Sequence, residues 1–147
     1  MATLERALSL LATRAVRREY IERAVARAGL SLSARAAWLL VRLERDPALD
    51  LVALAHAHRA DPERLEVAAA ELRQRGLVED RPAPDGGRPR RELTRDGCDA
   101  LTRLVGARRA LLTEVLEDWA PEKREELAEV VQRFSRELVP DPAPYSA

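Results

Sequence analysis

The chain has 147 residues, in which 25 Lys and Arg balance 25 Asp and Glu. This length accommodates one domain, or one domain with a long terminal element. Hydrophobic residues make up 46% of the chain and aromatic residues only 3%, which favours packed helices over a sandwich of sheets. The neutral total argues against indiscriminate binding of polyanions, because nucleic-acid modules usually carry a basic excess.

Targeting signals and metal sites are not evident in the sequence. No apolar run approaches the roughly 20 residues needed to cross a bilayer, and arginines interrupt the first apolar segment, unlike in a signal peptide. We therefore expect a cytoplasmic protein. The single cysteine, Cys98, excludes an internal disulfide and a thiolate zinc cluster. His56 and His58 would lie on different sides of a helix, so neither a metal nor another cofactor is expected.

The N-terminal part of the chain has the pattern of a long amphipathic helix. Apolar residues recur at three- and four-residue steps from Leu4 to Val25. Gly29 follows at a position where a left-handed residue commonly ends a helix. The sequence therefore predicts one helix over residues 3–28.

Three shorter helices are predicted next. Ser33 caps the first, which ends before Asp46-Pro47 because proline disfavours a helical conformation in the preceding residue. Asp50 caps a short second helix. The third, residues 62–75, begins with an Asp-Pro start signal and ends at Gly76.

The periodicity then changes to that of a hairpin. Residues 77–81 and 90–94 are short extended candidates on either side of a turn-rich segment, residues 82–89. This hairpin is the only credible β element in the sequence.

Two more helices are predicted after the hairpin. A long helix begins at Thr94 or Asp96, has one apolar side that extends to Trp119, and is closed by Pro121. An amphipathic helix follows, up to residue 139. The proline-rich tail, residues 140–147, has the composition of a disordered segment.

Two short helices joined by a turn, a hairpin with an arginine-bearing tip and a further helix form the plan of a winged helix-turn-helix. The stretch from Leu54 to Val78, which ends in Arg-Gly-Leu-Val, resembles the MarR family of bacterial regulators. Asp85-Gly86-Gly87-Arg88 resembles the wing motif of that family, and Leu93-Thr94-Arg95-Asp96-Gly97 is similar to its L-T-x-x-G. The resemblance covers nearly the whole chain in element order.

The resemblance implies a mainly α fold with a small β-hairpin wing and long terminal dimerisation helices. It implies one domain over residues 1–139, with a winged-helix core at about 33–95 and dimerisation helices at about 3–28 and 95–139. The apolar stripes of the terminal helices independently favour a homodimer. A two-fold dimer would bury these stripes and place two recognition helices about one DNA turn, roughly 34 Å, apart.

The candidate DNA-binding face lies on the helix over 62–75 and on the wing. Helical spacing places Leu65, Ala69 and Leu72 on the inner side of this helix. The candidate contacts to double-stranded DNA are four outward-facing residues of the helix and three arginines of the wing: Glu63, Arg64, Glu66, Val67, Arg88, Arg90 and Arg91.

The charge of this face leaves two functions open. Residues 61–75 hold four acids and three arginines, whereas residues 81–95 hold five arginines and two acids. The first function is a ligand-responsive, dimeric transcriptional regulator whose wing arginines bind DNA. The alternative is a cytosolic regulatory or interaction domain with weakened or lost DNA binding. The segment Asp118-Trp119-Ala120-Pro121-Glu122 and the helix after it also resemble cytosolic domains fused to major-facilitator efflux transporters.

A small-molecule effector is implied by the resemblance, although its identity is not. Trp38 and Tyr20 are candidates for the ligand cleft, and core packing is the commoner fate of such residues. An enzyme is not expected: Gly86-Gly87 lacks the context of a phosphate loop, and no serine pairs with a plausible histidine and carboxylate.

Overall fold

The computed structural model describes residues 6, 9, 13–83 and 86–138, with side chains up to residue 133. The chain divides into two compact units, Met1–Arg109 and Ala110–Ala147. Over the described residues the structure is mainly helical with one two-stranded antiparallel sheet, which confirms the predicted fold class. No described helix is both long and apolar enough to cross a membrane.

The first complete described helix is α2 (Arg14–Arg27). Thr13 has an extended conformation (φ −66°, ψ 145°), and its side chain accepts a hydrogen bond from the amide of Val16 as an N-cap. The prediction of one uninterrupted helix over 3–28 is therefore wrong at Thr13, and most of residues 3–12 lie outside the described ones. The predicted end is confirmed, because Gly29 has a φ of +64° directly after the C-cap.

The next three helices begin at the predicted caps. Ser33 caps α3 (Ala34–Arg45), and its hydroxyl accepts from the amide of Ala36 at 3.1 Å. Asp50 caps α4 (Leu51–Ala57) and Asp61 caps α5 (Pro62–Gln74). Side-chain oxygens thus satisfy amides that the first turn of each helix leaves without a helical partner.

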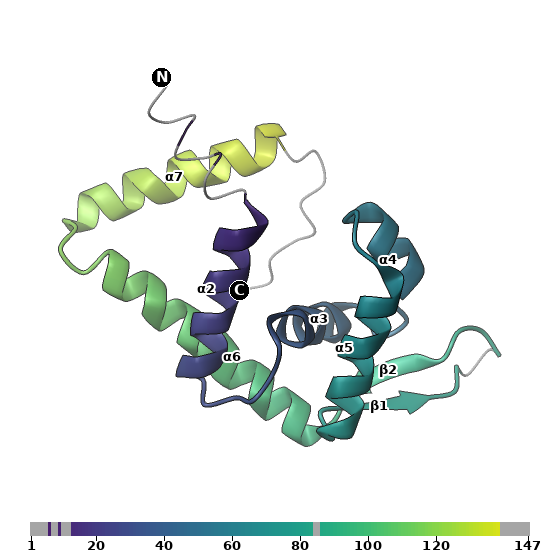
Figure 1. Cartoon of the computed structure of the whole chain (residues 1–147). Helices are drawn as coiled ribbons and strands as arrows, with labels where there is room; N and C mark the ends of the chain where they lie inside the picture. The colour runs from purple at the N-terminus through teal and green to yellow at the C-terminus, as the bar shows by residue number, and fades with distance from the viewer. Residues whose placement is uncertain (1–5, 7–8, 10–12, 84–85, 139–147) are drawn as a thin grey trace. The chain divides into compact units, whose positions relative to one another are not determined.

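The core of the first unit is built around α3. This helix lies between α2 and α5 (Figure 1) and packs on both. Apolar side chains of α3, α4 and α5 form the centre of the core, together with Val78 and Ala100. The largest fully buried side chains are those of Leu39, Leu40, Leu43, Leu65 and Leu72.

The wing is the antiparallel hairpin of β1 (Val78–Arg81) and β2 (Arg90–Leu93). Its register pairs Val78 with Leu93 and Asp80 with Arg91. The amide of Arg91 also donates to the carbonyl of Pro47 at 2.7 Å. This bond ties β2 to the loop that precedes α4, so the base of the wing is held against the helix-turn-helix.

Thr94 directly precedes helix α6 (Arg95–Val115) and joins its first turn to the segment between α5 and β1. Its hydroxyl donates to the carbonyl of Gly76 at 2.6 Å and accepts from the amide of Gly97 at 3.0 Å. Its amide donates to the carbonyl of Leu77 at 3.0 Å. The Arg-Gly-Leu-Val and Leu-Thr-x-x-Gly motifs therefore meet at one junction.

The second unit holds the end of α6 and helix α7 (Pro121–Leu138). Helix α6 ends at Val115, so the prediction that it continues to Pro121 is wrong at its C-terminal end. Arg124 donates to the carbonyls of Glu117 and Trp119, both at 3.0 Å. The side chain of Arg124 thus supplies donors to two carbonyls of the turn that, within the described residues, accept no backbone hydrogen bond from a helix.

Candidate nucleic-acid interface

Helix α5, the second helix of the helix-turn-helix, has a buried side and an exposed side. Leu65, Ala69 and Leu72 are buried, as the helical spacing predicts. The other side presents Glu63, Arg64, Glu66 and Val67, and Val67 is 68% exposed. Because it is so exposed, the side chain of Val67 can contact an apolar group of a partner, such as the methyl group of a thymine.

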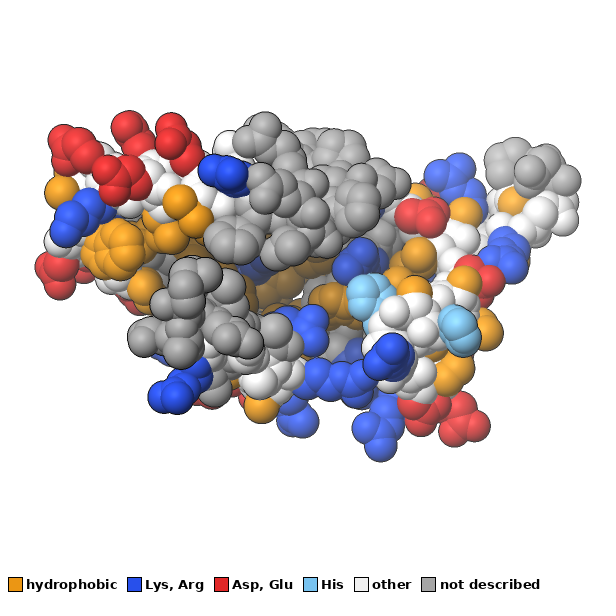
Figure 2. All heavy atoms as spheres, turned by 90° about the horizontal axis from the view of Figure 1, so that it is seen from above, with side chains coloured by type: hydrophobic (Ala, Val, Ile, Leu, Met, Phe, Trp, Pro, Cys, Tyr) orange, Lys and Arg blue, Asp and Glu red, His pale blue; other side chains and the backbone are white. Residues whose placement is uncertain are grey.

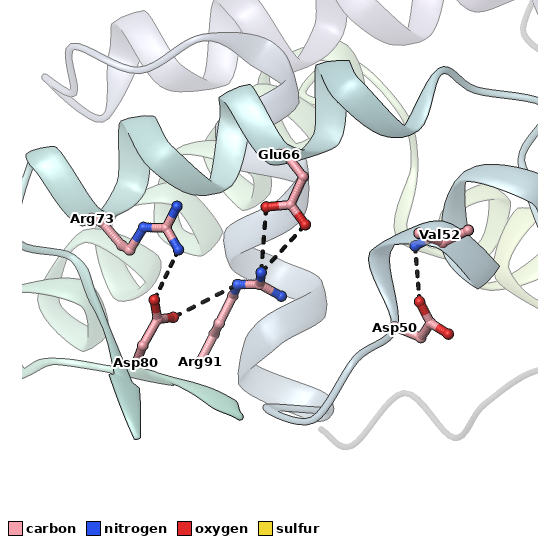
Figure 3. A network of polar contacts seen from close by, with 6 residues as sticks. All are labelled: Asp50, Val52, Glu66, Arg73, Asp80 and Arg91. Carbon is pink, nitrogen blue, oxygen red and sulfur yellow. Dashed lines mark hydrogen bonds and ion pairs between the residues drawn. The ribbon is translucent and has the colours of Figure 1, made fainter. Parts of the chain in front are cut away.

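Glu66 lies in a chain of ion pairs that joins α5 to both wing strands (Figure 3). Its carboxylate is 3.3 Å from Nη2 of Arg91, whose side chain is only 20% exposed. Asp80, opposite Arg91 in the sheet, lies 3.7 Å from Nε of Arg91 and accepts from Nη1 of Arg73 at 2.8 Å. Glu66 and Arg91, both expected to contact DNA, therefore already have partners within the protein.

The remaining wing arginines also lie beside carboxylates. Nη1 of Arg88 is 2.6 Å from Oδ2 of Asp50. Nε of Arg90 is 3.4 Å from a carboxylate oxygen of Glu92 but is buried and lacks hydrogen-bond geometry. Arg81 lies near the same carboxylate. The wing thus carries its cations together with internal counter-charges.

Both carboxylate oxygens of Asp50 have partners. Oδ1 accepts from the amide of Val52 at 2.9 Å (Figure 3) and from the amide of Ala53 at 3.2 Å. Oδ2 faces Nη1 of Arg88. The backbone hydrogen bond from Ala53 lowers the pKa of Asp50, and the backbone bond from Val52 and the side chain of Arg88 lower it further. Burial acts in the opposite direction. Asp50 is therefore ionised at physiological pH.

The first turn of α5 is the least constrained part of this face. Arg64 is exposed, with Nε 3.6 Å from Oδ2 of Asp61. Over the described residues Glu63 has no ion pair, and its amide donates to Oδ1 of Asp61. Arg64 and Glu63 can both reorient toward a ligand without breaking a short hydrogen bond of their side chains.

The two aromatic candidates for a ligand cleft occupy different environments. Trp38 packs against the core, makes an edge contact with His58 at 5.3 Å, and lies 5.0 Å from the guanidinium of Arg42. Tyr20 donates to the carbonyl of Arg108 at 3.4 Å. None of these contacts brings the two rings together.

Several arginines lie near His58, the ring that contacts Trp38. Arg14 donates to the carbonyl of Arg59 at 3.0 Å, and Figure 2 shows both histidines on one face beside basic side chains. Burial, followed by the charges of Arg42 and Arg17, lowers the pKa of His58. Arginines of α2 and α3 therefore make the surroundings of His58 electropositive.

No metal site is found in the part of the chain that the structure describes, where no three His, Cys, Asp or Glu side chains form a suitable group. Cys98 is exposed near the start of α6. It belongs neither to the ion pairs between α5 and the wing nor to the surroundings of Trp38.

Sequence reasoning missed the carboxylate partners of the wing. It treated Asp50 only as a helix cap, and no local signal connects Asp50 with Arg88, because the contact depends on how the wing packs. The pairing of Asp80 with Arg91 was accessible, since it follows from the register of a hairpin that the sequence did predict.

Comparison of the sequence with protein-family models and with curated proteins finds no match. Solved structures, in contrast, match over most of the chain. The MarR family protein RV2887 of Mycobacterium tuberculosis, solved in complex with salicylic acid, is 23% identical with a TM-score of 0.64, covering 82% of this chain and 88% of that one. RV1404 of the same organism is 22% identical with a TM-score of 0.68 and coverages of 97% and 94%.

Wild-type MarR of E. coli in its apo form is 16% identical, with a TM-score of 0.70, and the match covers 89% of this chain and 96% of that one. The chain has the MarR fold. The fold expected from the sequence motifs is therefore confirmed, with α5 as the second helix of the helix-turn-helix and the β1–β2 hairpin as the wing.

Proposed function

We propose that the protein is a transcriptional regulator that binds double-stranded DNA through α5 and the wing. The observation that carries this proposal is the exposed face of α5 beside an arginine-bearing wing in a MarR fold. In this arrangement the helix enters the major groove, and the wing lies over the adjacent backbone or minor groove. Arg88 and Arg90 would contact phosphates, while Glu63, Arg64 and Val67 would face base edges.

We further propose that the regulator is a homodimer. Helix α7, the end of α6 and the turn between them expose several large apolar side chains. These side chains are those of Leu112, Val115, Trp119, Leu127, Val130 and Val131. A second copy of the chain is the partner that would cover them, because a two-fold dimer also gives DNA recognition the required symmetry. Sedimentation of the wild type and of a Val131→Glu variant tests this, with a monomeric variant as the expected result.

A small aromatic anion is the effector that the region around Trp38 would accept. RV2887 was solved with salicylic acid, and here Arg42 and Arg14 lie near Trp38 and His58 without a carboxylate partner among the described residues. A guanidinium and an indole ring together suit a ligand that is both planar and anionic. Quenching of Trp38 fluorescence by salicylate, measured in a Trp119→Phe background, tests this proposal.

Fluorescence anisotropy with duplex DNA tests the main proposal. The protein is titrated against its own upstream DNA and against scrambled DNA from low to physiological salt. Arg88→Ala and Arg90→Ala should weaken binding to both duplexes and flatten the salt dependence, because the proposed contacts are to phosphates. Arg35→Ala, which removes the same charge from α3, is the control and should have little effect.

A second function is favoured by the ion pairs of the wing. Since Arg81, Arg88, Arg90 and Arg91 all lie beside carboxylates of their own chain, the fold would also suit a regulatory or interaction domain that has lost DNA binding. A folded dimer that binds neither duplex at low salt would support this alternative and overturn the main proposal.

A further inference from the structure

Asp50 and Arg88 connect the start of α4 with the wing across a long stretch of sequence. The distance between Nη1 of Arg88 and Oδ2 of Asp50 is 2.6 Å. The side chain of Arg88 is 65% exposed, whereas that of Asp50 is 30% exposed. Most of the Arg88 side chain is therefore in contact with solvent, whereas most of the Asp50 side chain is covered by the protein.

The carboxylate is held in place independently of the arginine. Its Oδ1 caps α4 through the amides of Val52 and Ala53, so Oδ2 points to the same place whether or not Arg88 is present. The bond from the amide of Arg91 to the carbonyl of Pro47 holds β2 beside this loop. Asp50 is consequently a preformed acceptor, and Arg88 is the mobile partner.

We infer that Asp50 sets the affinity of the protein for DNA by competing with a backbone phosphate for Arg88. This inference rests on the proposed function. A phosphate that approaches the wing meets an arginine whose charge is already neutralised, and it must displace a fixed carboxylate. Because most of the Arg88 side chain is exposed, the displacement requires only rotation of the arginine and no unfolding of the wing.

The substitution Asp50→Asn isolates this competition. Asparagine is as good an N-cap as aspartate, so α4 keeps its cap while the charge facing Arg88 is removed. We expect affinity for the upstream and the scrambled duplex to rise by about three- to ten-fold, since a phosphate contact carries no sequence information. The salt dependence should steepen by up to about one unit of slope, because Arg88 would then contact a phosphate in a larger share of the complexes.

Two further variants identify the mechanism. Asp46→Asn removes the same charge from the same loop and should raise affinity less than two-fold. Among the described residues, the Asp46 carboxylate accepts only from the amide of Ala48, at 3.1 Å. Arg88→Gln in the Asp50→Asn background should abolish the gain. Before DNA is added, the Nε–Hε NMR signal of Arg88 should shift in Asp50→Asn and stay in place in Asp46→Asn.

The outcomes separate this inference from the proposed function. Binding by the wild type with no gain in Asp50→Asn beyond that in Asp46→Asn would overturn the inference alone, as would a gain that persists without Arg88. Absence of binding by every variant at low salt would overturn the proposed DNA binding, and the inference with it. Binding by Asp50→Asn where the wild type binds weakly or not at all would support both.

Discussion

A Cβ atom on Gly97 would lie 2.0 Å from the carbonyl oxygen of Leu77 and 3.0 Å from its carbonyl carbon. The first turn of α6 therefore packs directly on the backbone between α5 and β1. The same carbonyl accepts from the amide of Thr94, so it cannot move away without losing a hydrogen bond. This close approach is the physical reason for a glycine after Leu93-Thr94.

Gly97→Ala should therefore destabilise the protein. We expect a loss of about 1–3 kcal/mol in the free energy of unfolding, because the added methyl group meets backbone and not a flexible side chain. Gly106→Ala is the matched control: Gly106 lies in the same helix, where an added Cβ would meet no described atom of another segment within 4 Å, and the change should raise stability by about 0.5–1 kcal/mol. Urea unfolding measures both, and equal effects would contradict the close packing.

Thr94→Val tests the hydrogen bonds that hold the first turn of α6 against the segment between α5 and β1. The hydroxyl of Thr94 bonds to the carbonyl of Gly76 and to the amide of Gly97, so its loss should cost about 1–2 kcal/mol of stability. Thr102→Val removes a hydroxyl whose one partner within the described part of the chain is the carbonyl of Cys98 in its own helix, and it should cost less than about 0.5 kcal/mol. Thermal unfolding of the two variants makes the comparison, and a Thr94→Val protein as stable as the wild type would refute the role of the hydroxyl.

Glu66→Gln and Glu63→Gln remove the same charge from the same face of α5. Of these two glutamates, Glu66 is the one paired with Arg91, so its substitution makes part of a guanidinium available to DNA. We expect both variants to bind scrambled DNA more tightly, Glu66→Gln by the larger factor, with stability changed by less than about 1 kcal/mol because the pair is partly exposed. Anisotropy with both duplexes provides the measurement. A selective loss for the upstream duplex would instead mean that the substituted carboxylate reads a base.

The lowered pKa of His58 predicts a dependence of stability on pH. Burial and the charges of Arg42 and Arg17 hold this pKa below its ordinary value of 6.5, so the unfolded chain binds the proton more readily than the folded one. The stability present above pH 6.5 is therefore lost as the pH falls through 6.5 toward the pKa of the folded state. His58→Gln should flatten the curve of unfolding free energy against pH between pH 6.5 and the folded-state pKa. The same slope in the wild type and in His58→Gln would show that His58 is not responsible.

Local signals predicted most helix boundaries correctly. Ser33, Asp50 and Asp61 are caps whose bonds reach only two or three residues along the chain, so the sequence contains all the information they need. The same reasoning failed at Thr13, where a continuous apolar pattern concealed a cap. It failed again after Val115, because the bonds of Arg124 to the preceding turn depend on how the chain folds back.

The residues of the candidate DNA-binding face were predictable from the sequence, but the ion pairs that they form were not. Helical spacing correctly assigned Leu65 and Leu72 to the core and Val67 to the surface. The contacts of Arg88 with Asp50 and of Arg91 with Glu66 join residues distant in sequence, and they require the angle between wing and helix to be known. Counting charges over a segment therefore overestimated how many wing arginines are free to meet a phosphate.

The register of the hairpin also determines where the wing can change length. Successive residues of a strand point to opposite faces, so an insertion of one residue within β1 or β2 would turn Arg91 away from Glu66 and Asp80. Between Arg81 and Arg90 the pairing imposes no such condition. The loop between the two strands could thus be lengthened or shortened, while β1 and β2 keep their register and their contacts with α5.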